Sequence, residues 1–282
     1  MSTEIISDSP FDKIMFLFAR VVRTIILISP ANCYIMLQRG RGMKKLPSLT
    51  IMFLLTVMLS GYSYGSPVFQ NTESSSVKRS LANVIKRIGP RAEARIRPLF
   101  EQAGVAYPPA RVTLIGLKDE LELEVWAEKN GSWVYIFTYD VLAASGKSGP
   151  KQKAGDRQVP EGIYRIAELN PNSRFHLSMK LDYPNRFDRI MAGNDGRSNL
   201  GGDIYIHGKA KSRGCLAVGD AAIEELFVLA ARTGPEKIQV VIVPYDLRKR
   251  GSGPRSVGPS WIARLYQTLG QELTKFRPKE RV

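Results

Sequence analysis

Residues 203–227, which read DIYIHGKAKSRGCLAVGDAAIEELF, contain the most informative pattern in this chain. The alternating apolar residues of DIYIHG predict a short β-strand that ends near His207. Asp220 is a suitable N-cap for a helix whose apolar stripe begins at Ile223. The glycine-containing turn between the two elements ends at Cys215. The segment therefore predicts a strand, a turn and a helix that bring one histidine and one cysteine close together.

The sequence on both sides of this segment alternates apolar and polar residues, as strands with one buried face do. This alternation predicts strands within residues 111–119, 120–143, 162–169, 173–184 and 237–246. The Asn130-Gly131 pair is a strong signal for a hairpin turn. Within residues 173–184 the alternation places Phe175 and Leu177 on the same apolar face. Most of the chain between residues 111 and 246 is therefore expected to be β-structure.

Helices are expected on either side of this β-rich region. Residues 77–103 have apolar residues at helical spacing, and the Gly89-Pro90 pair is expected to divide them into two helices. Residues 261–276, WIARLYQTLGQELTKF, form a further amphipathic segment. We therefore predict an α+β fold, a mainly-β domain with flanking helices. The predicted divisions are a helical N-terminal segment at 66–110, the β-rich domain at 111–246, and a basic linker with a C-terminal helix at 247–282.

The front of the chain carries an export signal. Residues 43–65 begin with Met-Lys-Lys, continue through an apolar run and end in small residues, the three regions of a secretory signal peptide. The apolar run is shorter than the about 20 residues of a membrane span. We interpret residues 1–42 as an over-extended N-terminus; the alternative is a long N-region that leaves an uncleaved anchor. The mature protein is therefore expected in the periplasm, touching membrane only through such an uncleaved N-terminal segment.

The composition limits the classes of function. The chain is 44% hydrophobic and 24% charged, which excludes a disordered protein. A net charge of +15 makes nucleic acid a candidate partner. No aromatic-interleaved basic motif or zinc knuckle is present, however, and the signal peptide directs the chain away from nucleic acid. A cationic exported protein can instead meet an anionic cell-wall polymer, so no nucleic-acid partner is expected.

The cysteine count favours chemistry at Cys215. The chain has two cysteines, and Cys33 lies before the expected cleavage site. Exported proteins usually pair their cysteines, so a single remaining thiol is notable. A thiol near a helix N-terminus and beside Arg213 is expected to have a lowered pKa, and His207 can serve as its base. Gly208 and Gly214 would let backbone N–H groups approach an oxyanion.

Two other interpretations of the pair stay open at this point. Cys215 can be a small buried residue and His207 a hydrogen-bonded strand end. A zinc site is the weaker alternative, because one cysteine and two histidines fall short of the usual ligand sets. We therefore expect no metal and no cofactor.

The pattern resembles the active-site signature of the L,D-transpeptidases, the YkuD-type family. The signature consists of His-Gly followed by Ser-x-Gly-Cys, found here as His207-Gly208 and Ser212-Arg213-Gly214-Cys215. The resemblance extends from about residue 111 to 246, and its longer blocks are similar to the murein L,D-transpeptidase subgroup that includes a lipoprotein-releasing amidase. It departs from the usual signature at Arg213, which stands in place of a histidine, and at Ala217, which stands in place of an arginine or asparagine.

The resemblance implies a function. It assigns Cys215 as nucleophile and His207 as proton donor and acceptor, with the other signature residues supporting the turn or an oxyanion. It implies a compact β-sandwich-like catalytic domain that attacks an amide next to meso-diaminopimelate in peptidoglycan stem peptides, through a thioester. The alternatives are an amidase that hydrolyses the link between diaminopimelate and a wall-linked lipoprotein, and a non-catalytic cell-wall-binding module.

Three residues upstream are candidates for binding substrate. His176 is expected to point away from the apolar face of its strand, where it lines the substrate groove or has a structural role. Ser173 and Arg174 are candidates for binding a carboxylate, because arginine matches a carboxylate with two hydrogen bonds. The group that orients His207 is expected to be a backbone carbonyl rather than a side chain.

Overall fold

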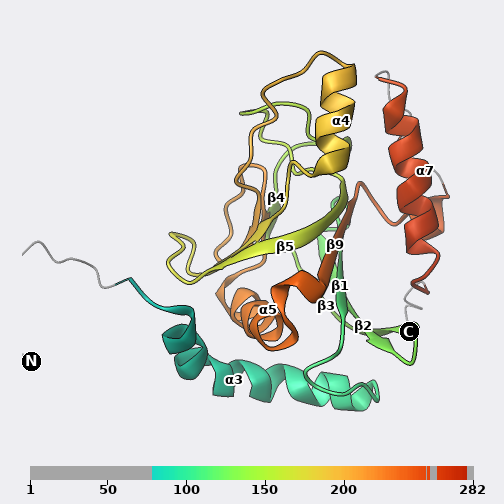
Figure 1. The fold of residues 1–282 in the computed structure, drawn as a ribbon. Coiled ribbons are helices and arrows are strands. Elements are labelled where there is room, and N and C mark those ends of the chain that lie inside the picture. Colours follow the sequence, from blue (N-terminus) through green and yellow to red (C-terminus); the bar gives the residue numbers. More distant parts are fainter. Residues whose placement is uncertain (1–77, 252, 255–258, 278–282) are drawn as a thin grey trace, which may run out of the picture. The chain divides into compact units, whose positions relative to one another are not determined.

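The computed structural model describes residues 78–251, 253–254 and 259–277, which all belong to one compact unit, Ser75–Val282 (Figure 1). The expected signal peptide and the residues before it lie outside the described residues. Within the described part, no helix is both long enough and apolar enough to span a membrane.

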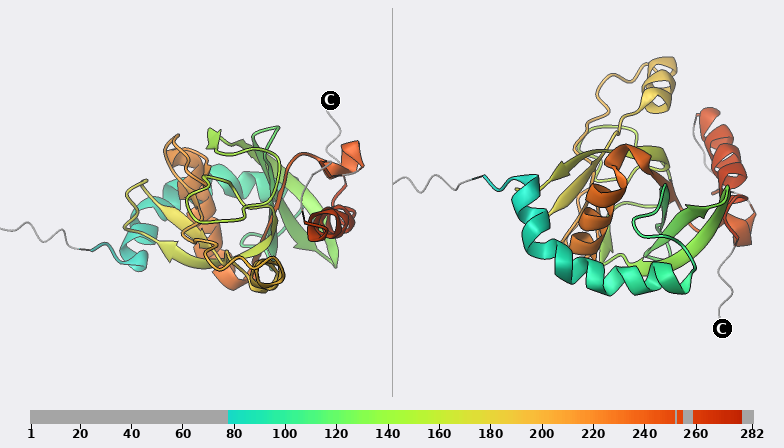
Figure 2. Two further views of the ribbon diagram at one scale, coloured as in Figure 1. Left: turned by 90° about the horizontal axis from the view of Figure 1, so that it is seen from above. Right: turned by 60° about the horizontal axis from the view of Figure 1, so that its bottom comes forward.

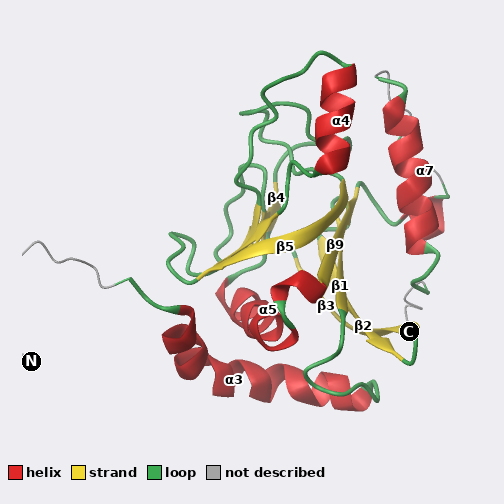
Figure 3. Cartoon of the chain, viewed as in Figure 1, coloured by secondary structure: helices red, strands yellow, loops and turns green. Residues whose placement is uncertain are grey.

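A mixed sheet forms the centre of this unit (Figure 3). Its order is β3-β2-β1-β9-β5-β6-β7-β8-β4. The strands are β1 Val112–Leu117, β2 Glu122–Lys129, β3 Ser132–Asp140, β4 Ala143–Ala144, β5 Gly162–Asn170, β6 Ser178–Leu181, β7 Tyr205–His207, β8 Leu216–Ala217 and β9 Ile238–Val243. β1 and β9 pair in parallel, as do β7 and β8, while the other neighbours are antiparallel. The prediction of an α+β fold rich in β-structure is confirmed.

Alternation along the strands produces a core on each face of the sheet. In β1, Leu114 packs in the core beneath α5, Asp220–Thr233, whereas Ile115 packs in the core beneath α7, Trp261–Leu273. In β9, Val240 and Val241 divide between the two cores in the same way. Figure 1 shows α5 and α3 on one side of these strands and α7 on the other. The hairpin predicted at Asn130-Gly131 is confirmed by the register that joins β2 to β3.

The N-terminal helix differs from the prediction. α3, Leu81–Gln102, is one continuous helix that contains Pro90 and Pro98, so the expected break at Gly89-Pro90 is wrong. A proline inside a helix costs about 3 kcal/mol. Buried residues along one face of α3 stabilise it against the rest of the unit: Val84, Ile88, Ala92, Ile96 and Phe100. Figure 2 shows α3 running beside α5, and packing of this kind supplies most of the stability of helices in proteins.

The strand expected over residues 173–184 also begins later than predicted. β6 starts at Ser178, and Phe175 is 42% exposed whereas Leu177 is buried. The two residues therefore do not share one apolar face, because the chain before β6 is a turn in which His176 has a positive φ of 74°. β6 is followed by α4, Arg186–Asn194, and β9 by the short α6, Leu247–Arg250. The prediction of an N-cap at Asp220 is shifted by one residue, since Gly219 caps α5.

Candidate active site

Parallel pairing of β7 and β8 brings the cysteine and the histidine together. His207 pairs with Ala217, and Ile206 pairs with Leu216. Continuing this register by one residue sets Cys215 level with Tyr205. Alternate residues of a strand point to the same face, so Cys215 and His207 face the same side of the sheet, two residues apart along neighbouring strands.

The ring of His207 has a defined orientation. His207 is 2% exposed, and its Nδ1 lies 2.6 Å from the carbonyl oxygen of Gly208. Because a carbonyl can only accept, Nδ1 must carry the proton. In the neutral ring Nε2 is then the lone-pair nitrogen, which is the state required of a general base. The prediction that a backbone carbonyl orients this histidine is confirmed, and the carbonyl is that of the next residue.

Two serines hold the turn that presents Cys215. Ser212 Oγ donates to the carbonyl of Cys215 at 2.7 Å and accepts from the Cys215 N–H at 3.3 Å. Ser145 Oγ lies 3.0 Å from Ser212 Oγ and accepts from the Gly214 N–H at 2.6 Å. Gly214 has a φ of 99°, which favours glycine. The expected role of Ser212 in shaping the turn is therefore present, and Ser145 adds a partner 67 residues away in the chain.

The N–H groups expected to bind an oxyanion already have acceptors. The Gly208 N–H donates to the carbonyl of Leu177 at 3.2 Å, and the Gly214 N–H donates to Ser145. An oxyanion would have to share these donors. Gly208 is needed for another reason, since a Cβ there would lie 2.6 Å from Asp220 Oδ1 and 2.7 Å from the carbonyl of Phe175. The structure thus supports a turn-forming role for both glycines, and their part in binding an oxyanion stays a prediction.

The thiol is not activated in the resting state. Burial raises the pKa of the Cys215 thiol, although a hydrogen bond from the Tyr205 backbone opposes the shift. The expected lowering is therefore wrong, because β8 separates the thiol from the start of α5, and the sulfur has no hydrogen bond to His207 within the described structure. Burial lowers the pKa of His207. The resting pair is consequently a neutral thiol beside a neutral imidazole.

Phe175 is a site residue that the sequence did not reveal. Its ring stacks on the His207 ring, with centroids 4.4 Å apart and 30° between the planes. The contact covers one face of the imidazole and contributes to its burial. The turn-forming run Asn-Pro-Asn-Ser at residues 170–173 was the available signal that Phe175 precedes the strand.

The three predicted substrate-binding residues lie in this turn, but not together at the thiol. His176 Nε2 lies 2.9 Å from Glu224 Oε1, and Glu224 also binds Arg91 of α3 at 2.7 Å. Although burial opposes it, these hydrogen bonds hold the pKa of Glu224 below its usual range. Ser173 Oγ accepts from the Phe175 N–H at 3.1 Å and closes the local turn. His176 and Ser173 therefore have structural contacts, while Arg174 is exposed.

A cationic cavity lies next to the turn of Cys215. It has a volume of about 310 Å³, and its lining includes Arg157, Arg213, Ile204 and Lys151. Lys151 also acts electrostatically on Cys215, lowering the pKa of the thiol slightly against the effect of burial. Sγ of Cys215 lies 3.8 Å from the carbonyl oxygen of Asp203. The two sequence neighbours of Asp203, Gly202 and Ile204, line the cavity. Arg213, two residues before Cys215, therefore lines a cavity suited to negatively charged groups. In the described part of the chain, no group of three or more acidic, histidine or cysteine side chains could hold a metal ion.

Comparison with known proteins agrees with this arrangement. The family model of the L,D-transpeptidase catalytic domain (YkuD) matches residues 118–242. The Escherichia coli K12 protein YafK, which is named as an L,D-transpeptidase, is 31% identical over 135 residues, or 46% of this chain and 52% of YafK. The same match is found in the O157:H7 strain. The chain thus spans about half the length of the curated relatives it matches.

Solved structures also share similarity. The helical cell shape determining protein Pgp2 from Campylobacter jejuni aligns with a TM-score of 0.41 and 21% identity, covering 55% of this chain and 56% of Pgp2. Bd1075 from Bdellovibrio bacteriovorus aligns with a TM-score of 0.37 and 20% identity, covering 61% of this chain and 57% of Bd1075. The family model covers the segment that holds the histidine, the turn and the cysteine, and residues 118–242 therefore match the YkuD-type L,D-transpeptidase catalytic domain.

Proposed function

We propose that the protein is a periplasmic, cysteine-dependent peptidoglycan L,D-transpeptidase that acts on stem peptides containing meso-diaminopimelate. Cys215 is the nucleophile and His207 is the general base and acid. The observation that carries this proposal is the His207 ring, whose Nδ1 is fixed on the Gly208 carbonyl at 2.6 Å, leaving Nε2 as the basic nitrogen on the face shared with Cys215.

The resting protonation states favour proton transfer during the attack rather than before it. His207 Nε2 removes the Sγ proton as the sulfur bonds to the amide carbonyl carbon of the donor peptide. The resulting imidazolium donates this proton to the leaving amine nitrogen, and a thioester remains on Cys215. An incoming amine then attacks the thioester carbonyl, His207 accepts its proton, and the thiol is restored when that proton returns to sulfur.

The cationic cavity supports a substrate with carboxylates near the scissile bond. Arg213 and Arg157 line this cavity, and neither has an ion-pair partner among the described residues. Guanidinium groups without acidic partners are available to bind carboxylates with two hydrogen bonds. A stem peptide that ends in a carboxylate and carries a second one on diaminopimelate has this chemistry.

Mass spectrometry of muropeptides after incubation with the purified protein tests the proposal. New cross-links between two diaminopimelate residues are expected with the wild type and not with Cys215→Ala, which removes one sulfur atom and little volume. Lys86→Ala, on the exposed side of α3 and within the mature protein, is the control and should convert muropeptides like the wild type. Conversion by Cys215→Ala at the wild-type rate would refute the cysteine mechanism.

The same experiment distinguishes the alternatives. Released lipoprotein without new cross-links would indicate the amidase, in which water replaces the amine as acceptor. Binding to sacculi without any conversion would indicate a cell-wall-binding module. Both outcomes contradict transpeptidation as the principal activity.

A further inference from the structure

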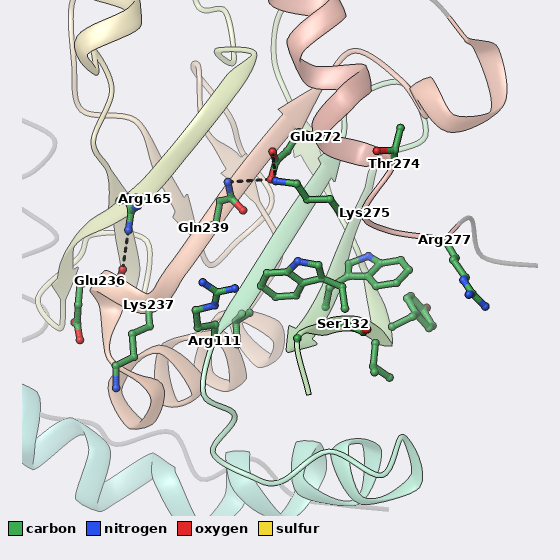
Figure 4. Close-up of a pocket in the computed structure, with 16 residues that line it drawn as sticks. Arg111, Ser132, Arg165, Glu236, Lys237, Gln239, Glu272, Thr274, Lys275 and Arg277 are labelled. Carbon is green, nitrogen blue, oxygen red and sulfur yellow. Dashed lines mark hydrogen bonds and ion pairs between the residues drawn. The ribbon is translucent and has the colours of Figure 1, made fainter. Parts of the chain in front are cut away.

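A second and larger hollow lies on the face of the sheet that α7 covers. It has a volume of about 1340 Å³ and crosses β1, β2, β3 and β9 beside the C-terminal end of α7 (Figure 4). Sites for single small molecules usually occupy about 300–1,000 Å³. The hollow is therefore larger than a small ligand requires.

The hollow continues along α7. Arg165 and Gln239 line both the large hollow and a second one of about 330 Å³. Tyr164 and Phe187 line both this second hollow and a third, of about 390 Å³, which lies between α4 and α7. We refer to these three neighbouring hollows, which share lining residues, as the α7 groove. Their arrangement in series suits an extended ligand.

The α7 groove has more unpaired cations than unpaired acids, since only Glu236, Asp182 and Asp188 among its acidic lining residues form no ion pair with a described residue. Five lining cations form no ion pair with any described residue: Arg165, Arg186, Lys237, Arg264 and Arg277. Figure 4 shows Arg165 and Lys237 on one side of the large hollow and Arg277 on the other. Two further lining cations already bind acids, since Arg111 pairs with Glu128 and Lys275 with Glu272. Positive charge spread along a groove attracts a linear anion.

Aromatic rings accompany these charges. Trp133 lines the large hollow and is half-buried, with the Arg111 guanidinium 5.6 Å from its ring centroid. Phe187 lines the other two hollows. A sugar ring has an apolar C–H face and polar edges, which match an aromatic ring flanked by hydrogen-bonding groups. Gln239, shared by two of the hollows, provides such a group.

We propose that the α7 groove binds a carboxylate-bearing glycan strand, with its cations on the carboxylates and its aromatic rings on the sugar faces. This inference rests on the proposed function, because it takes the glycan of the cell wall as the ligand. The groove is connected to the catalytic site through one segment of chain. α4 lines the groove, and the residues that follow α4 lead to Gly201 and Ile204 in the cavity beside Cys215.

Binding of purified, peptide-free glycan strands tests the inference. All binding is measured in the Cys215→Ala background, so that no thioester forms. The double variant Arg165→Glu/Lys237→Glu should weaken the affinity at least about tenfold, because two attractive charges become repulsive. The matched control, Lys86→Glu/Arg87→Glu on the exposed side of α3, makes the same change of net charge away from the groove.

The control should bind within about threefold of the parent, and thermal melting should show that both double variants are folded. An equal loss of glycan affinity in both double variants would indicate attraction by the overall charge of the protein and would overturn the proposed binding site in the groove. A groove variant that binds like the parent would also overturn it.

Single-stranded oligonucleotide is the competing ligand, since it too combines ring faces with negative charge. Groove-dependent binding of the oligonucleotide but not of the glycan would refute the proposal that the groove binds glycan.

The two proposals fail separately. Muropeptide conversion by the wild type tests the enzyme, whereas binding by the Cys215→Ala protein tests the groove. Conversion without a groove effect would remove only this inference. Groove-dependent glycan binding without conversion would leave this inference in place and remove the enzymatic proposal.

Discussion

Removal of Lys118 should destabilise the protein strongly through the acid that it leaves behind. Lys118 Nζ lies 2.8 Å from Glu161 Oε1, and the two side chains are 5% and 0% exposed. The ammonium also donates to the carbonyls of Lys147, Gly149 and Val159. Glu161 in turn accepts from the Tyr266 hydroxyl of α7 at 2.7 Å. The pair therefore joins the loop at residues 145–160 to the C-terminal helix.

The expected magnitude follows from burial. Burial lowers the pKa of Lys118 even though Glu161 opposes the shift, so desolvation outweighs attraction and the pair itself adds little net stability. Lys118→Met instead leaves a carboxylate buried without its cation, which costs about 3–5 kcal/mol. Adding Glu161→Gln removes that charge, so the double variant should recover at least about half of the loss.

Urea unfolding at neutral pH measures these differences. The control is Lys180→Met, which breaks the exposed Lys180–Asp203 pair, 33% and 78% exposed, and should cost less than about 1 kcal/mol. The reasoning is refuted when Lys118→Met is no more destabilising than Lys180→Met. A double variant less stable than Lys118→Met alone would also contradict it, because the loss would then not come from the orphaned charge.

Two further predictions concern pH. Because burial raises the pKa of Cys215, its alkylation rate by iodoacetamide should inflect above the value of about 8.5 usual for a free thiol; an inflection below 8 would indicate a preformed thiolate. Because burial lowers the pKa of His207, the base stays neutral as the pH falls past its ordinary pKa, and kcat/KM should decline only below about 6.5. Phe175→Ala uncovers one face of the ring, so this acidic limb should move to higher pH; an unchanged limb, with activity merely reduced, would contradict shielding by Phe175.

Local sequence patterns were sufficient to predict several of the elements. The hairpin at Asn130-Gly131 and the strand ending at His207 both appear where the sequence predicted them. The signals for these elements are short-range. A turn is specified by its own residues, and a strand with one buried face is recognised from the alternation of its own apolar and polar residues. The signature around Cys215 likewise identified the family, because its residues are close together in the chain.

Features that depend on contacts between distant segments could not be predicted from local patterns. Packing on α5 keeps α3 continuous through Pro90, and Ser145 reaches across 67 residues to hold the turn at Ser212. The direction of the Cys215 pKa shift was also invisible in the sequence, where Arg213 and a nearby helix suggested the opposite. The physical reason is that the pKa of the thiol depends on its distances from charged groups and on how deeply it is buried. Both of these are set only when the chain folds.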